Sequence, residues 1–324
     1  MYIISTIMKF TIITLVAWLG PAYAIQNGTA VKDSTLYPYF VTIGNPHVCG
    51  GAFLSLEPEA WVLTAAHCVY DAPLPPPSPN PYFASFGDVS RPDQHIEAIT
   101  DWIVHPGYVT SSGDTDMRYD LALVKLKRPV KESSTVSRVA IYQDTMALNV
   151  NTTASVMGVG YTGFGLPQPS QLLHMLVQVT KYTPGSLEMT ETNPPVNSAV
   201  CHGDSGGPLI ERSPWSGRPY VLGILSRIFN AYDPDPGNAT CPFNFDTSTN
   251  VTTDGYVNVA YFTSWIADMT GLSEQFLTTP PTADVSWPIP NLQKAVLSTA
   301  NRDVPVPFHI ITCIFIFSLF YHMV

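Results

Sequence analysis

Between Val41 and Val259 the chain alternates short β-branched and aromatic runs with turns rich in glycine and proline. The runs are YFVTIG, GGAFLSL, WVLTAA, YFASFG, DLALVKL, ASVMGVG, LLHMLVQVT, YVLGILS and YVNV. Many short strands with such punctuation are typical of β-barrels and β-sandwiches. One segment, Ala260–Thr270, has apolar residues at helical spacing, and Gly271 is placed to end it. The sequence therefore predicts an all-β protein with a C-terminal helix.

The composition is that of a globular chain with a sizeable core. Of 324 residues 45% are hydrophobic and only 12% are charged, and the formal net charge is −10. An acidic balance without basic clusters argues against binding to nucleic acid or to anionic membrane surfaces. No C-x-x-C pair and no close group of histidines and cysteines indicates zinc. We expect neither a metal nor a cofactor.

The N-terminal residues resemble a secretory signal. Met8–Ala24 contains one lysine, a short apolar run and then Ala-Tyr-Ala, which is the usual order of the three signal-peptide regions. The apolar run Phe10–Leu19 is shorter than the roughly 20 residues that span a bilayer. We therefore predict that residues 1–24 are a signal peptide, that the protein is secreted and that its processed form begins at Ile25.

The C-terminal end is also apolar. Phe308–Val324 follows a polar, proline-containing spacer and the small residues Ser298–Ala300, a pattern that signals a GPI anchor. A single transmembrane tail is the alternative, although no lysine or arginine follows it. We predict a Pro/Ser/Thr-containing stalk at residues 272–300, a hydrophobic signal at 301–324, and an extracellular, membrane-anchored location.

Cysteines and glycosylation motifs fit a secreted protein. Removal of the tail with Cys313 would leave an even set of four cysteines, which predicts two disulfides with three possible pairings. The four are Cys49, Cys68, Cys201 and Cys241. Four sequons predict a glycoprotein: Asn27, Asn151, Asn238 and Asn250.

Three short stretches contain residues suited to nucleophilic catalysis. WVLTAAHCV places His67 after a strand, YDLALVKL places Asp120 at the head of one, and CHGDSGGPL places Ser205 in a glycine-rich turn. A serine hydroxyl attacks a carbonyl only when a base removes its proton. A buried aspartate beside the histidine would fix the imidazole tautomer that accepts this proton.

The glycine-rich turn could also stabilise the transition state. Two backbone N–H groups must approach the developing oxyanion closely, and those of Gly203 and Ser205 are the candidates. Asp114 and Asp116 are rivals of Asp120 for the role of the acid. Both lie in a polar segment, whereas Asp120 leads an apolar strand.

The chain order His67, Asp120, Ser205 resembles that of the chymotrypsin/trypsin family of serine endopeptidases. CGGAFLS before the histidine and DGYVNV after the serine also resemble family segments, and the resemblance covers roughly Ile25 to Thr270. It implies two six-stranded antiparallel β-barrels, within a protease domain at residues 25–271, with the triad in the cleft between them. It also implies protein or peptide substrates and protein inhibitors as partners.

The resemblance assigns further roles by position. It implies disulfides Cys49–Cys68, beside the catalytic histidine, and Cys201–Cys241, at the specificity pocket. In this family the ammonium of a new N-terminal residue pairs with the aspartate before the nucleophile, here Ile25 with Asp204. Relatives carry a propeptide before that residue, whereas here Ile25 directly follows the predicted signal. Our hypothesis is that signal peptidase liberates the activating amine without a zymogen stage.

The specificity pocket departs from the common pattern. The resemblance places five residues around it: Ala199, Ser226, Arg227, Ile228 and Gly255. Ala199 at the base cannot recruit a basic side chain, and Ile228 would narrow the mouth, while Gly255 leaves the opposite wall open. We expect a shallow apolar pocket for small or medium aliphatic side chains rather than trypsin-like specificity. Recruitment of an acidic side chain by Arg227 and His202 is the alternative.

Two functions from different classes fit these residues. The first is a surface-anchored serine endopeptidase, which the complete triad favours. The second is a non-catalytic protease homologue that binds a partner through its cleft, which the unusual Arg227 and Ile228 favour.

Overall fold

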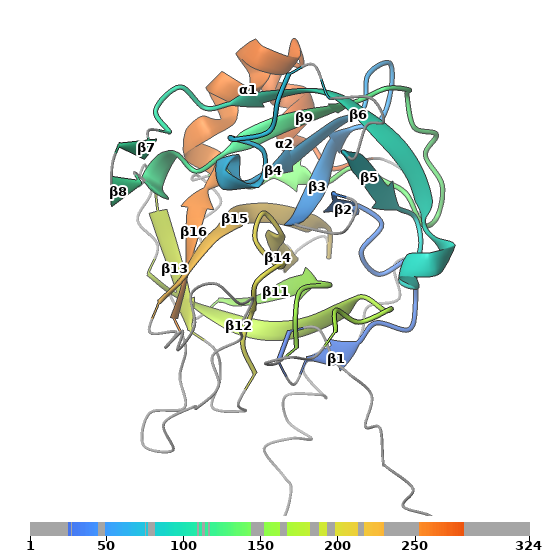
Figure 1. Ribbon diagram of the computed structural model, residues 1–324, viewed down its shortest axis with the longest axis vertical. Coiled ribbons are helices and arrows are strands. Elements are labelled where there is room, and N and C mark those ends of the chain that lie inside the picture. The colour runs from blue at the N-terminus through green and yellow to red at the C-terminus, as the bar shows by residue number, and fades with distance from the viewer. Residues whose placement is uncertain are drawn as a thin grey trace, which may run out of the picture. The chain divides into compact units, whose positions relative to one another are not determined.

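The computed structural model describes residues 25–26, 28–44, 49–74, 76, 82–108, 110–111, 114–115, 117–143, 152–162, 167–181, 188–192, 198–212, 217–229 and 253–281 (Figure 1). All of these lie in one unit of the chain, Met1–Val285. The predicted signal peptide, the hydrophobic tail, most of the stalk and the asparagines of the four sequons lie outside the described residues. Within the described ranges, no helix has both the length and the apolar character that a membrane span requires.

The first half of the chain forms a closed antiparallel barrel. Its strands are β2 (Phe40–Ile43), β3 (Cys49–Ser55), β4 (Trp61–Thr64), β5 (Phe83–Phe86), β6 (His95–Val104) and β9 (Ala122–Leu126), in the order β2-β3-β4-β9-β6-β5. Successive side chains of a strand point to opposite faces. Phe53 and Val62 accordingly pack inside the barrel, while Leu54 and Leu63 pack into a second core outside it.

The second half forms a larger antiparallel sheet that also closes on itself. Its strands are β11 (Thr153–Gly158), β12 (Leu173–Lys181), β13 (Glu188–Thr192), β14 (Pro208–Arg212), β15 (Pro219–Phe229) and β16 (Thr253–Asn258). The pairing order is β12-β11-β14-β15-β16-β13, and β13 pairs back to β12. The expected arrangement of two six-stranded barrels is thus confirmed.

Four further short strands in the described ranges are not among the six strands of either barrel. The strand β1 (Thr29–Ala30) pairs with β12, and β10 (Ala140–Ile141) runs parallel to β15. The strands β7 (Thr110–Ser111) and β8 (Asp114–Thr115) pair with each other.

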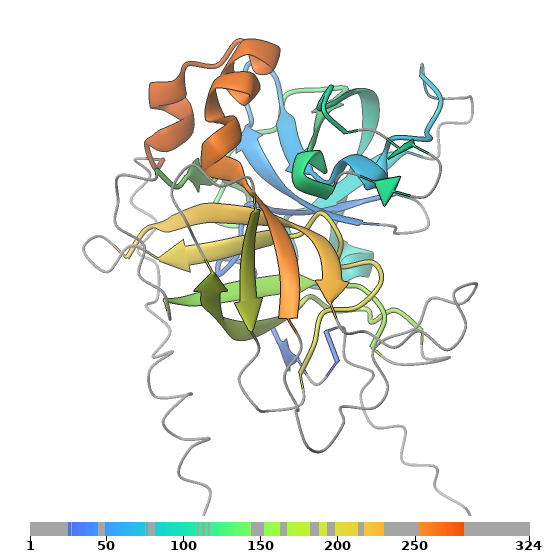
Figure 2. The ribbon, with the colours of Figure 1, turned by 90° about the vertical axis from the view of Figure 1, so that its left-hand side faces the viewer.

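The predicted C-terminal helix is present. A 3-10 turn (Val259–Phe262) leads into α1 (Thr263–Thr270), and Gly271 ends it with a φ of +71°, a conformation that glycine adopts without strain. A second helix, α2 (Glu274–Thr278), follows within the segment predicted as stalk, and its Leu277 is buried. The folded part of the chain therefore continues past Gly271. Figure 2 shows both helices on the side of the first barrel.

One apolar core joins the two barrels and the helices. Its buried members come from the first barrel, the second barrel, α1 and α2, and include Tyr39, Leu54, Leu63, Leu121, Met157, Ile210, Val221, Val257, Ile266 and Leu277. The two barrels and the helices are therefore packed against one another through this core.

Candidate active site

His67 lies in a short 3-10 turn, Ala66–Cys68, separated by one residue from the end of β4. A disulfide joins the adjacent Cys68 to Cys49 at the start of β3, the first of the two pairs that the resemblance implied. The Cys49 and Cys68 sulfurs and a His67 ring nitrogen lie within 4.8 Å of one another. Both sulfurs are bonded to each other, so this group does not offer thiolates to a metal.

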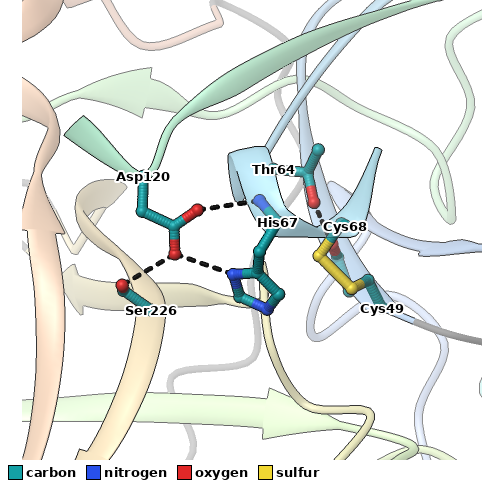
Figure 3. A network of polar contacts seen from close by, with 7 residues as sticks. Cys49, Thr64, His67, Cys68, Asp120 and Ser226 are labelled. Atoms are coloured by element: carbon teal, nitrogen blue, oxygen red, sulfur yellow. Dashed lines mark hydrogen bonds and ion pairs between the residues drawn. A yellow bond between two sulfur atoms is a disulfide. The ribbon is translucent and has the colours of Figure 1, made fainter. Parts of the chain in front are cut away.

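Asp120 precedes β9 and is fully buried. Its carboxylate accepts three hydrogen bonds (Figure 3): Oδ1 from the His67 backbone N–H at 2.9 Å, and Oδ2 from His67 Nδ1 at 2.7 Å and from the Ser226 hydroxyl at 2.7 Å. A carboxylate oxygen only accepts, so Nδ1 donates this hydrogen bond, and in the neutral imidazole Nε2 is then the nitrogen that can accept a proton. The His67 side chain is 31% exposed. The arrangement suits a general base that an incoming substrate can reach.

Of the two rival acids, the structure describes only the backbone position of Asp114. Asp114 lies in β8, and Asp116 lies outside the described residues. The contacts to both the backbone and the ring of His67 come from Asp120.

Ser205 lies in a tight turn between Cys201 and β14. Its carbonyl accepts a hydrogen bond from the N–H of Gly50 in β3 at 2.7 Å, and the N–H of Gly206 donates to the carbonyl of Leu225 in β15 at 2.8 Å. A Cβ at Gly206 would lie 3.1 Å from the backbone nitrogen of Ala65, two residues before His67. The turn is therefore held against the segment that leads into the histidine.

Gly203 has a φ of +93°, which residues with side chains rarely adopt. Its N–H belongs to the same turn as the N–H of Ser205, two residues later. Two N–H groups on one rigid turn are the type of donor pair that stabilises an oxyanion in acyl transfer.

Asp204 is buried beneath this turn. Its Oδ1 accepts from the Gly160 N–H and its Oδ2 from the Cys201 N–H, both at 2.8 Å. Burial raises the pKa of Asp204 to about 7, against the opposing effect of these two hydrogen bonds. A Cβ at Gly158 would lie 2.0 Å from Asp204 Oδ1, so glycine is required there. Within the described part of the chain, no cationic side chain forms an ion pair with this carboxylate.

Ile25 is fully buried in the core of the second barrel. The next residue, Gln26, pairs with Ala199: the Gln26 N–H donates to the Ala199 carbonyl at 2.8 Å, and the reverse bond is 3.2 Å. Ala199 is two residues from Cys201, whose N–H binds Asp204. Ile25 therefore lies next to the loop of Asp204, with a φ of +49° that is unusual for a β-branched residue.

The five residues assigned to the specificity pocket lie on two sides of this region. Ala199 is buried against Gln26, and Ser226 is buried at a register shift of β15 between Leu225 and Arg227. Arg227 pairs with Gly255 of β16. Ile228 pairs with Asp254 through the backbone, and its side chain lies outside the described set.

Two residues of this region were not singled out from the sequence. Asp254 is a fully buried acid on the strand that carries Gly255. Thr64 is a fully buried polar residue in the otherwise apolar strand β4. In both cases the only sequence signal for a role at the site was a polar residue within a β-rich run.

The second disulfide is described only in part. Cys201 is disulfide-bonded, and Cys241 lies outside the described residues. The Cys201–Cys241 pairing remains a prediction.

Comparison with known proteins agrees with the fold and with the order of these segments. The sequence profile of the trypsin family matches residues 25–266. Serine protease SP24D of Anopheles gambiae is 28% identical over 250 residues, which are 74% of this chain and 79% of that protein. Transmembrane protease serine 11A of Homo sapiens is 24% identical over 242 residues, 70% of this chain and 50% of that protein. Serine proteinase stubble of Drosophila melanogaster is 31% identical over 205 residues, 58% of this chain and 24% of that protein.

The chain therefore spans half or less of the second and third of these relatives. The family profile, in contrast, covers most of the chain and includes every segment that meets at the site. This protein belongs to the trypsin family of serine proteases.

Proposed function

We propose that the protein is a secreted, surface-anchored serine endopeptidase that uses His67, Asp120 and Ser205 as its catalytic triad. The observation that carries the proposal is the Asp120 carboxylate. It binds both the backbone and the ring of His67 and leaves Nε2 as the proton acceptor.

In the proposed reaction the Ser205 Oγ attacks the carbonyl carbon of the scissile peptide bond while His67 Nε2 takes the hydroxyl proton. The N–H groups of Gly203 and Ser205 hold the oxyanion of the tetrahedral intermediate. Collapse of the intermediate breaks the C–N bond, and His67 gives its proton to the leaving amine. Water then attacks the acyl-enzyme with the same base and the same donors, which releases the acid and restores Ser205. Throughout, Asp120 keeps its charge next to the imidazolium.

Activation is proposed to follow cleavage of the chain before Ile25. The supporting observations are the buried Ile25, its neighbour Gln26 bound to Ala199, and the buried Asp204. A free Ile25 amine in this region would supply a positive charge to Asp204, and a buried charge is tolerated when it is paired. Sequencing the N-terminus of the secreted protein tests the cleavage site, because any start other than Ile25 contradicts it.

The specificity is proposed to be for small or medium aliphatic side chains. Ala199 offers no charge at its position, Ile228 would narrow the mouth, and Gly255, paired with the half-buried Arg227, leaves the opposite wall open. A peptide library reports the side chain preferred before the scissile bond. A strong preference for arginine or lysine would contradict the proposal, and a preference for glutamate or aspartate would favour recognition by Arg227 and His202.

The anchor is proposed to be a GPI group added near residue 300, with a transmembrane tail as the competing arrangement. A phosphatidylinositol-specific phospholipase should release the protein from cells that express the full chain. Retention after this treatment would favour the transmembrane tail.

Hydrolysis by the purified protease domain tests the activity itself. We expect residues 25–281 with a free Ile25 amine to cleave peptides, and Ser205→Ala to lose this activity by several orders of magnitude. Ser85→Ala is a matched control, since Ser85 is a half-buried serine of β5 in the first barrel. A folded wild-type protein that cleaves no peptide but binds a partner through the cleft would support the non-catalytic alternative.

A further inference from the structure

A buried hydroxyl connects the strand before the catalytic histidine to the turn of the nucleophile. Thr64 is the last residue of β4, three residues before His67, and is fully buried. Its Oγ1 donates a hydrogen bond to the carbonyl of Gly50 in β3 at 2.8 Å, the bond drawn from Thr64 in Figure 3. A buried polar side chain in an apolar strand requires such a partner.

Gly50 extends this contact to the nucleophile. Its N–H donates to the carbonyl of Ser205 at 2.7 Å, while its own carbonyl accepts from Thr64. A Cβ at Gly50 would lie 2.9 Å from the Cα of Gly207, so only glycine permits this approach of β3 to the turn. The two bonds thus link Thr64 to Ser205 through one residue.

The Thr64 hydroxyl also touches the turn directly. A Cβ at Gly206 would lie 2.3 Å from Thr64 Oγ1 and 2.6 Å from the Gly50 carbonyl oxygen. Gly206 has a φ of +75°, which glycine adopts without strain. The turn therefore rests on the pair formed by Thr64 and Gly50.

Thr64 also pairs with the strand that follows the acid of the triad. In the β4–β9 pair it lies opposite Ala122, two residues after Asp120. Through its backbone or its hydroxyl, Thr64 thus adjoins the segments that carry the base, the acid and the nucleophile, which come from two different barrels.

We propose that Thr64 is a positioning residue that sets the distance between Ser205 and His67. This inference rests on the proposed function of these two residues. The hydroxyl fixes Gly50, and Gly50 fixes the backbone of Ser205 relative to the strand that leads into the turn of His67. A displacement of about 1 Å between reacting groups costs about a hundredfold in rate. Thr64 touches neither substrate nor reacting atoms in this account.

The test uses the secreted protein with its natural N-terminus and four substitutions. Thr64→Val removes the hydroxyl and keeps the β-branched shape. Thr64→Ser and Thr64→Ala differ only by the hydroxyl, so they test the same bond if the valine variant does not fold. Thr42→Val is the matched control, because Thr42 of β2 is equally a buried threonine, with its hydroxyl 3.3 Å from the Ser85 carbonyl.

Titration with a fluorophosphonate counts the competent active sites, and kcat is then expressed per titrated site. We expect kcat per site to fall ten- to a hundredfold in Thr64→Val and Thr64→Ala with KM changed less than about threefold. Thr64→Ser and Thr42→Val should stay within about threefold of wild type. A role confined to stability would lower the number of sites and leave the rate per site unchanged.

Two results would overturn the inference: a rate per site in Thr64→Ala equal to that of Thr64→Ser, or a loss in Thr42→Val as large as that in Thr64→Val. Both are distinct from failure of the proposed function. If the proposed function were wrong, the folded wild-type protein would not react with the fluorophosphonate at all.

Discussion

The buried carboxylate of Asp204 predicts the direction in which the free energy of unfolding changes with pH. The prediction applies to the chain in which a peptide bond still joins Ile25 to residue 24. Burial raises the pKa of Asp204 from 3.8 to about 7. Between these values the folded state binds more protons than the unfolded state, so the free energy of unfolding falls as the pH rises. The stabilising contribution is complete below about pH 4 and is lost as the pH passes 7. Three pKa units correspond to about 4 kcal/mol.

The perturbation is Asp204→Asn in protein that retains Ala24. The asparagine has no charge to bury. Between pH 4 and pH 7.5 the free energy of unfolding of the variant should therefore rise by about 4 kcal/mol relative to that of wild type. Its loss of one acceptor for the Gly160 and Cys201 N–H groups adds a penalty that does not depend on pH. The informative quantity is therefore the change with pH in the difference between the two proteins.

The same substitution should act in the opposite direction when Ile25 has a free amine. An ammonium beside Asp204 favours the ionised carboxylate, so removal of the charge should destabilise the processed protein at pH 7. Preparations with and without Ala24 can be compared by urea unfolding, followed by tryptophan fluorescence with the disulfides intact.

Other groups that titrate in this range cancel in the comparison. Burial raises the pKa of Glu211 to about 7 and lowers the pKa of His174 to about 4, but both residues are present in wild type and variant. The reasoning would be refuted if the difference between wild type and Asp204→Asn were independent of pH in the form that retains Ala24. It would also be refuted if both forms responded with the same sign.

Three further substitutions have defined outcomes. Ser226→Ala should lower kcat about tenfold with little change in KM, because Asp120 loses one of its three hydrogen bonds; steady-state kinetics measure this. Burial against Tyr37 lowers the pKa of His174 to about 4, so this residue should lower the free energy of unfolding of wild type by about 3 kcal/mol as the pH falls from 6.5 to 4. His174→Gln should remove this contribution, which urea unfolding at the two pH values measures. Gly206→Ala should abolish active protein in a secretion assay, because its Cβ would meet backbone and the φ is +75°.

The fold was predictable where compact apolar runs are bounded by turn residues. The strands β3 and β4 are continuous apolar runs because both of their faces are buried, and Gly271 ended the predicted helix as expected. The strand β6 escaped notice because HIEAITDWIV mixes exposed charged residues with a few buried positions. The helix α2 was missed because five residues offer too short a period to detect, and its position depends on the burial of Leu277.

The site was predictable in its parts but not in its connections. Asp120 could be preferred over Asp114 because it heads an apolar strand. The link from Thr64 through Gly50 to Ser205 depends on how two barrels meet. Segments so distant in the chain leave no local pattern, so this contact required the structure.

The most direct test of the account is the mass of the folded, processed protein after reaction with a fluorophosphonate, followed by mapping of the modified peptide. The account predicts one adduct per chain, on Ser205, formed orders of magnitude more slowly in His67→Ala and absent in Ser205→Ala. A folded protein that begins at Ile25 and remains unmodified, or carries its adduct on another residue, would contradict it.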